Sequence, residues 1–311
     1  MELLFGVAVL ASALGGIDPL AQDQDDLFSV RSLSRLVVAD DRQSRYGREW
    51  ACTMLAGTDP PPKEALAALI AAMRDTRPEN ERARAACARA IAVLGPSAAP
   101  AIDALVSFLD EDVLSKQWQE EHSPQEHGRA FEQVIKALGA IGPAAVPALV
   151  ERLDFRPDRQ GENTNPAWAG ASESLGLIGT PAIPALLQAL KNSAKRYGAI
   201  DALGNVGGVA AEESVPALTA LSTDPDALVR WRVMTALQHI GPAASLAVPV
   251  LIQALEDPDQ SVRSEAVLAL ETIGPPAAAA VPVLKKLLSD EHLGYSQKIQ
   301  VQHALEKIER R

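Results

Sequence analysis

The sequence predicts an all-α fold, an α-solenoid of about eight antiparallel helix pairs, and three observations support this prediction. The composition is 47% hydrophobic but only 4% aromatic, which suits closely packed helices better than β-sheets. A phrase of Gly, small residues and Pro recurs, and its last three intervals are 32 or 33 residues. An apolar pattern typical of one helical face precedes each copy of that phrase.

The recurring phrase is predicted to join two helices. It runs from an apolar residue and Gly, through Pro or small residues, to a second Pro. Gly suits the left-handed αL conformation that ends many helices, and a Pro just after it cannot continue the helix. The second Pro suits the first turn of the next helix, where its missing N–H is not needed. The six copies end at Pro100, Pro147, Pro184, Pro216, Pro249 and Pro282, which are separated by 47, 37, 32, 33 and 33 residues.

The helix before each Gly has a signature of its own. A basic or aromatic marker residue is followed by a small or apolar residue three positions later and a larger apolar residue seven positions later. These offsets place all three side chains on one helical face. The marker residues are Arg48, Arg84, Phe131, Trp168, Arg196, Arg230, Arg263 and Lys298. We therefore expect a repeat array over residues 43–311, preceded by a polar linker or N-terminal cap at residues 22–42.

An acidic turn separates the two helices of the later repeats. Asp226 and Asp259 lie four residues before the marker residues Arg230 and Arg263. Aspartate is a good N-cap, and its charge suits the positive end of the helix dipole. The same aspartates are candidates to pair with the arginine of their own or a neighbouring repeat. We interpret these four residues as a structural ladder.

Residues 255–275, LEDPDQSVRSEAVLALETIGP, combine these features and closely resemble bacterial HEAT repeats and the HEAT-like repeats of phycobilisome lyases. The resemblance extends over roughly residues 43–310. It implies an armadillo-type architecture in which the second helices line a concave surface. It also implies a non-catalytic scaffold that binds a protein partner. The alternative is a lyase- or hydroxylase-like enzyme of the HEAT-like group.

Residues 1–21 are expected to form a separate N-terminal segment. The uncharged apolar run at residues 3–14 resembles the core of a secretory signal, with cleavage after Ala13 or Ala21, but it lacks the usual basic start. A short membrane anchor and a capping helix are the alternatives. A signal would place the protein in the periplasm or cell envelope, and otherwise we expect it in the cytoplasm. No later segment is expected to reach membrane length.

Charge and composition argue against several kinds of chemistry. A formal net charge of −11 disfavours a nucleic-acid partner, although one basic groove is compatible with it. Cys52 and Cys87 are interpreted as small buried residues, with a disulfide as the alternative. His122 and His127 lie beside glutamates, where a solvated loop is favoured over a divalent-metal site. No cofactor and no catalytic motif are expected.

An aromatic pair is the first candidate for partner binding. Tyr197 and Trp231 directly follow marker arginines in consecutive repeats, and Arg232 is adjacent to Trp231. Two aromatic rings with an arginine suit a binding hot spot. Packing of both rings between repeats is the alternative.

The second candidate is an acidic insertion at residues 110–128, which includes Glu120 and Glu121. Another insertion occupies residues 154–166. Both follow the first helix of their repeat, so we expect them on one edge of adjacent repeats. Insertions on one edge often mark a contact face, but tolerated surface loops are an equal alternative.

Overall fold

The computed structural model describes residues 30–38, 44–57, 63–77, 80–111, 124–155, 165, 167–289 and 293–310. Every regular element in these ranges is an α-helix or a short 3₁₀ helix, so the all-α prediction is confirmed. The predicted N-terminal segment at residues 1–21 lies outside the described residues.

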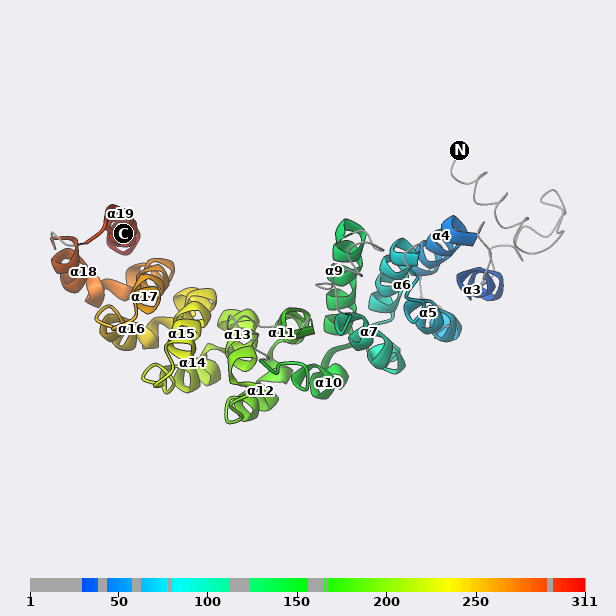
Figure 1. Ribbon diagram of the computed structural model, residues 1–311, viewed down its shortest axis with the longest axis horizontal. Helices are drawn as coiled ribbons and strands as arrows, with labels where there is room; N and C mark the ends of the chain where they lie inside the picture. The colour runs from blue at the N-terminus through cyan, green and yellow to red at the C-terminus, as the bar shows by residue number, and fades with distance from the viewer. Residues whose placement is uncertain are drawn as a thin grey trace. The chain divides into compact units, whose positions relative to one another are not determined.

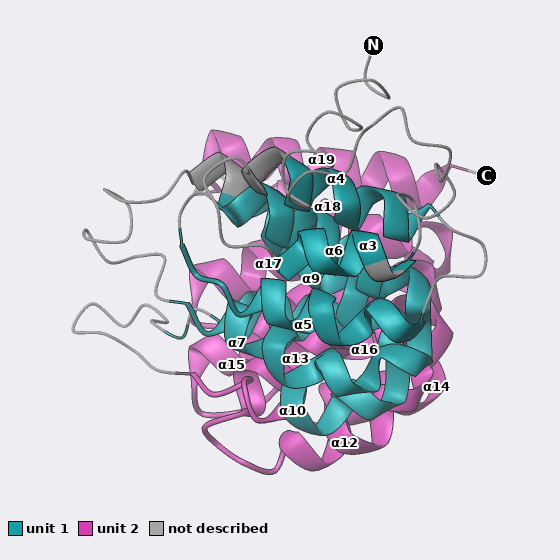
Figure 2. Cartoon of the chain, turned by 90° about the vertical axis from the view of Figure 1, so that its right-hand side faces the viewer, with its two compact units in different colours: residues 1–149, 165–174 teal, residues 150–164, 175–311 magenta. Residues whose placement is uncertain are grey.

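The chain divides into two compact units (Figure 2). Unit 1 comprises residues 1–149 and 165–174, and unit 2 comprises residues 150–164 and 175–311. Each unit is built from helix pairs, and every marker residue lies in the second helix of its pair. The first helices are α3 (Val30–Val38), α5 (Leu66–Met73), α7 (Ile102–Leu109), α10 (Val146–Val150), α12 (Ile183–Ala189), α14 (Ala211–Thr219), α16 (Val248–Ala254) and α18 (Val281–Leu288). The second helices are α4 (Ser44–Ala56), α6 (Glu81–Leu94), α9 (Pro124–Ile141), α11 (Ala167–Ile178), α13 (Arg196–Val206), α15 (Ala227–Ile240), α17 (Gln260–Ile273) and α19 (Tyr295–Glu309).

In unit 1, the second helices α4, α6 and α9 pack in series, and α3, α5 and α7 pack against them (Figure 1). Helix α3 lies in the stretch that was expected to be a polar linker or cap. Its Leu33, Leu36 and Val37 are buried, and it packs on α4 as the first helix of a pair. The helical array therefore includes residues before position 43.

In unit 2, the second helices α13, α15, α17 and α19 likewise pack each on the next (Figure 1). The predicted face of each helix is its buried face, as Val233 and Leu237 of α15 and Leu270 of α17 are fully buried. One helix pair cannot bury such a face alone, so each repeat depends on its neighbours.

Glycines of positive φ end the second helices, with φ from +55° to +79° at six positions. Gly241, for example, has φ 70° and ψ −139°. Positive φ agrees with the sequence prediction, but this ψ lies outside the expected αL region and in one open essentially only to glycine. A 3₁₀ segment follows, and Pro184, Pro249 and Pro282 then occupy the first turn of the next helix as predicted.

Three helical stretches are long and apolar enough to cross a membrane by length and composition: Glu81–Leu109, His127–Val150 and Ala227–Ala254. By that criterion, the expectation that no later segment reaches membrane length is wrong. Each stretch joins a second helix to the next first helix through one of the glycines of positive φ. Its apolar length therefore combines two packed helices.

Candidate functional site

Marker arginines connect consecutive repeats of unit 2 through ion pairs. Arg230 donates to both carboxylate oxygens of Asp257, from Nε and Nη2, at 2.8 Å each. It also donates to the backbone carbonyl of Asp224 at 2.9 Å, which holds the turn of its own repeat. Arg196 of the preceding repeat donates to the Asp224 carboxylate at 3.2 Å. Each arginine thus fastens the turn of the next repeat.

The second aspartate of each turn caps a helix. Asp226 accepts a hydrogen bond from the Leu228 N–H at 2.9 Å, and Asp259 accepts one from the Ser261 N–H at 2.8 Å. Both aspartates have extended backbone angles, which is the usual N-cap geometry.

The structure assigns pairing and capping to different aspartates. Asp224 and Asp257 take the arginine side chains, and the capping residues Asp226 and Asp259 do not. Arg263 donates to the backbone carbonyls of Asp257 and Pro258 at 2.6 and 2.9 Å. The four predicted ladder residues therefore all contribute to the turns, but the arginines pair with acids two positions earlier.

Charge pairing perturbs the ladder carboxylates. The hydrogen bonds from Arg230 hold the pKa of Asp257 below its usual value, although partial burial opposes this. In unit 1, Arg77 lowers the pKa of Asp75, which also pairs with the marker residue Arg48 at 3.0 Å. These carboxylates are satisfied within the fold, so we interpret them as structural.

The structure brings Tyr197, Trp231 and Arg232 together on α13 and α15. The guanidinium carbon of Arg232 lies 5.7 Å from the centroid of each ring. Its Nη1 donates to Asp201 of α13 at 2.5 Å. All three predicted side chains are partly exposed. The two rings thus flank one anchored guanidinium, a geometry that permits cation–π contact.

The Tyr197 side chain is also anchored from other directions. Its hydroxyl donates to Asp226, the N-cap of α15. Its ring packs against Phe155 with centroids 4.6 Å apart and an interplanar angle of 58°. Burial raises the pKa of Tyr197 to about 12, and the hydrogen bond to Asp226 acts in the same direction.

Two carboxylates beside this cluster are held in unfavourable surroundings. Burial raises the pKa of Asp201, and the charge of Arg232 only partly offsets this effect. Burial also raises the pKa of Glu265 on α17, against hydrogen bonds from Thr235 and Trp231. Polar contacts therefore link three consecutive second helices along this surface.

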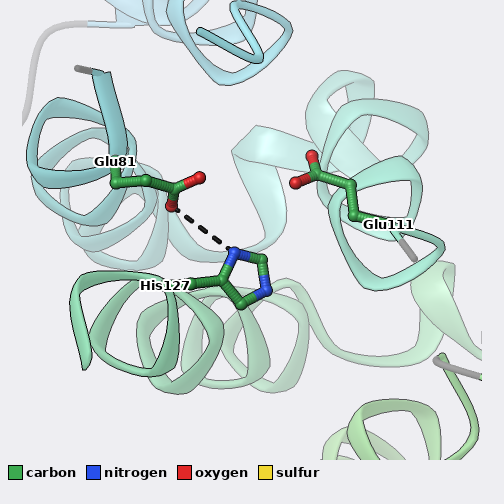
Figure 3. Close-up of side chains that lie close together, drawn as sticks. All are labelled: Glu81, Glu111 and His127. Carbon is green, nitrogen blue, oxygen red and sulfur yellow. Dashed lines mark ion pairs between the residues drawn. The ribbon is translucent and has the colours of Figure 1, made fainter. Parts of the chain in front are cut away.

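A buried charge cluster occupies the equivalent ladder position in unit 1. The marker residue Arg84 donates to Glu111, 27 residues later, and to Glu81 at 3.2 Å. His127 Nδ1 lies 3.5 Å from Glu81 Oε2 (Figure 3). The His127 ring stacks on Phe108 at 4.6 Å, and the Arg84 guanidinium lies over the same ring at 4.2 Å. Arg84 and Glu81 are at most 1% exposed.

This cluster has the donor set of a metal site. Ligand atoms of Glu81, Glu111 and His127 all lie within 4.8 Å of one another (Figure 3). However, Arg84 supplies a cation that contacts both carboxylates, and a metal ion would have to compete with it. A buried pair of this kind is destabilised strongly when one partner is lost. The residues therefore fit a closed structural cluster better than an open metal centre.

Some sequence expectations on the acidic insertion are changed by this arrangement. His127 was expected in a solvated loop, but it is 6% exposed on α9 because its helix brings it onto Phe108. His122, Glu120 and Glu121 lie outside the described residues, as do most of both insertions. Their position on one edge stays a prediction.

The two cysteines form a disulfide, so the alternative interpretation applies and not the preferred one of free buried thiols. Cys52 of α4 and Cys87 of α6 are bonded, with Cα atoms 5.0 Å apart. Both lie three positions after, or four after, the marker residue of adjacent second helices, and both are fully buried. The bond therefore joins neighbouring repeats of unit 1.

Sequence reasoning missed a hollow of about 300 Å³ on α4, α6 and α9. Three arginines, Arg82, Arg89 and Arg129, contribute to its lining, and we call it the arginine hollow. The remaining lining residues are Glu49, Ala85, Ala86, Glu132 and Gln133. The available signal was the pair of arginines seven positions apart on α6, which share a helical face. The acidic net charge concealed it.

Stacked helix pairs joined by an arginine ladder define a helical repeat protein. Residues 167–238 and 215–306 match the model for HEAT repeats, and residues 132–155 match the model for the PBS lyase HEAT-like repeat. The chain is therefore a HEAT-repeat protein. Comparison with curated protein sequences finds no match.

Solved structures show the same fold at low identity. The chain is similar to Kap121p in its complex with Pho4p, with 15% identity and a TM-score of 0.50, over 99% of this chain and 37% of Kap121p. It is similar to the karyopherin Kap121p bound to the SUMO protease Ulp1p, with 14% identity, a TM-score of 0.48 and coverage of 98% and 41%. An engineered protein matches with 23% identity, a TM-score of 0.43 and coverage of 97% and 84%.

Proposed function

We propose that this HEAT-repeat protein is a non-catalytic scaffold that binds a protein partner through the surface of its second helices. The observation that carries the proposal is the placement of Arg232 between two partly exposed rings, Tyr197 and Trp231, from consecutive repeats. Aromatic residues and arginine dominate the binding energy of protein interfaces. The resemblance to HEAT proteins predicts that this surface is concave.

The cluster is suited to binding because it is held in place before any partner arrives. Asp201 fixes Arg232, and Asp226 with Phe155 fixes Tyr197. Side chains that are already ordered lose little conformational entropy on association. The similar structures of Kap121p contain protein partners, which supports a protein partner for this chain.

Substitution of Trp231 by alanine tests the proposal. Ser264 occupies the corresponding position one repeat later on α17, so Ser264→Ala is a matched control. Partner capture by the intact protein is compared with capture by each variant, alongside thermal melting. We expect Trp231→Ala to lose captured partner at an unchanged melting temperature. A lower melting temperature with unchanged capture would show that the ring only packs between repeats.

We further propose that the protein is exported. The apolar run at residues 3–14 and the Cys52–Cys87 disulfide both support this, because disulfides persist mainly in oxidising compartments. Cell fractionation followed by alkylation of free thiols tests it. Recovery of fully alkylated protein from the cytoplasm would contradict export.

An enzyme of the HEAT-like group is the rival function, and the Glu81–Glu111–His127 cluster is the observation that favours it. Such an enzyme would hold a metal at these ligands. Metal analysis of the purified protein, and of an Arg84→Gln variant as a control, separates the two functions. Stoichiometric iron or zinc in the unmodified protein would favour the enzyme.

A further inference from the structure

We propose that the arginine hollow of unit 1 binds an acidic segment of a polypeptide partner. This inference rests on the proposed function, because it gives the same scaffold a second contact surface and defines its chemistry. It depends on residues of unit 1 alone, so it can be tested separately from the Trp231 cluster of unit 2.

The hollow exists because α6 carries small residues where its neighbours carry long ones. Ala85 directly follows the marker residue of α6, and the same position holds Glu49 on α4 and Glu132 on α9. The next position is Ala86 on α6 and Gln133 on α9. Two alanines on the middle helix therefore form a floor, and longer side chains from the outer helices form the walls.

Positive charge gathers around this floor. Arg82 and Arg89 lie seven residues apart on α6, and Arg129 approaches from α9; all three are exposed. Among the described residues, neither Arg89 nor Arg129 forms an ion pair with a carboxylate, and Arg89 only donates to the Thr53 hydroxyl at 3.4 Å. The hollow thus offers arginine donors in a chain whose net charge is −11.

One of the two acidic lining residues is already neutralised. Glu132 accepts a hydrogen bond from Lys136 at 2.5 Å, one helical turn later. The same lysine lowers the pKa of Glu132. Glu132 is therefore a weak competitor for the arginines, and the lining keeps a positive excess.

Carboxylates are the groups that this lining recognises best. The planar guanidinium of arginine pairs with a carboxylate through two parallel hydrogen bonds. Glu49 and Gln133 offer acceptors for the backbone N–H groups of a bound peptide. The Glu49 carboxylate and the acidic chain would repel a nucleic-acid backbone. A volume of about 300 Å³ admits a few side chains and not a folded domain.

The test uses the full chain and a fluorescein-labelled peptide of eight glutamates, followed by fluorescence anisotropy at low salt. The variant is the double substitution Arg89→Gln and Arg129→Gln. The matched control is Arg35→Gln and Arg74→Gln, which removes the same charge from exposed positions on α3 and at the end of α5. We expect roughly tenfold weaker binding for the hollow variant and less than about twofold for the control. Melting curves verify that both variants are folded.

Three results would overturn the inference: no binding of octaglutamate, an equal loss in the control variant, or tighter binding of an eight-nucleotide single-stranded DNA than of the peptide. The two proposals fail separately. Loss of partner capture in Trp231→Ala without octaglutamate binding would leave the scaffold proposal intact and remove this one. Octaglutamate binding that depends on Arg89 and Arg129, with unchanged capture by Trp231→Ala, would do the reverse.

Discussion

Gly204 marks the closest approach of α13 and α15, and adding a side chain there tests the packing of unit 2. A Cβ atom built on Gly204 would lie 2.9 Å from Cα and 3.1 Å from Cβ of Ala236. The first contact is with backbone, so no side-chain rotation relieves it. One of the two helices must shift by a few tenths of an ångström.

The expected magnitude combines two opposing effects. Overpacking a close-packed interface costs about 1–3 kcal/mol. Replacing Gly by Ala inside a helix contributes about 1 kcal/mol in the other direction. Gly204→Ala should therefore lower the free energy of unfolding by about 1 kcal/mol, and Gly204→Val by more, because valine lacks alanine's helix propensity.

Gly128 of α9 is the matched control. It is also a helical glycine, but it is exposed and a Cβ there would meet nothing within 4 Å. Gly128→Ala should raise the free energy of unfolding by up to about 1 kcal/mol. Urea unfolding followed by circular dichroism measures both, and hydrogen exchange should place the Gly204→Ala effect in α13 and α15. A gain of stability in Gly204→Ala similar to that in Gly128→Ala would refute the close packing.

The remaining predictions concern the disulfide and the titrating groups. Replacing Cys52 and Cys87 by alanine should lower the free energy of unfolding of unit 1 by roughly 4 kcal/mol, since the bond closes a loop with a sequence separation of 35 residues. Urea unfolding with and without reductant measures this, and an unchanged midpoint in both would contradict it. Asp257 has a lowered pKa in the folded state, so the stability it contributes is present above its unfolded pKa of about 3.9 and is lost as pH falls further. Asp257→Asn should therefore be less stable than the unmodified protein at neutral pH, with a shallower loss of stability in acid; parallel curves would show that Arg230 does not perturb it. Tyr197 has a raised pKa of about 12, so its contribution is present below its unfolded pKa of about 10 and is lost as pH rises towards 12. Absorbance titration of Tyr197→Phe should lack the last tyrosine ionisation, and an unchanged titration would contradict the environment described for its hydroxyl.

The helix ends were predictable because each is specified within a few residues of sequence. Every repeat needs the same local devices, a glycine of positive φ after the second helix and an aspartate before it. Repetition then makes a weak signal strong, since one Gly-Pro pair means little and six at similar spacing define a period. The same reasoning located all eight second helices.

Contacts between repeats were harder to predict, because they depend on the rotation of one helix against the next. Asp224 and Asp226 are two residues apart in one turn, and sequence alone did not assign one to Arg196 and the other to the cap. His127 is similar, since only the packing of α9 shows that its ring stacks on Phe108. The arginine hollow needs three helices in register, which no single segment encodes.

Helix α6 shows how one sequence can encode a structural face and a binding face together. Arg84 and Cys87 lie three residues apart on the buried face, where a charge cluster and a disulfide fix the helix in place. Arg82 and Arg89 are exposed on another face of the same helix. Because the buried contacts restrict movement of the helix, the two exposed arginines keep a fixed spacing. Recognition by a fixed array loses less entropy than recognition by a mobile one, so the buried face also sets the affinity of the exposed one.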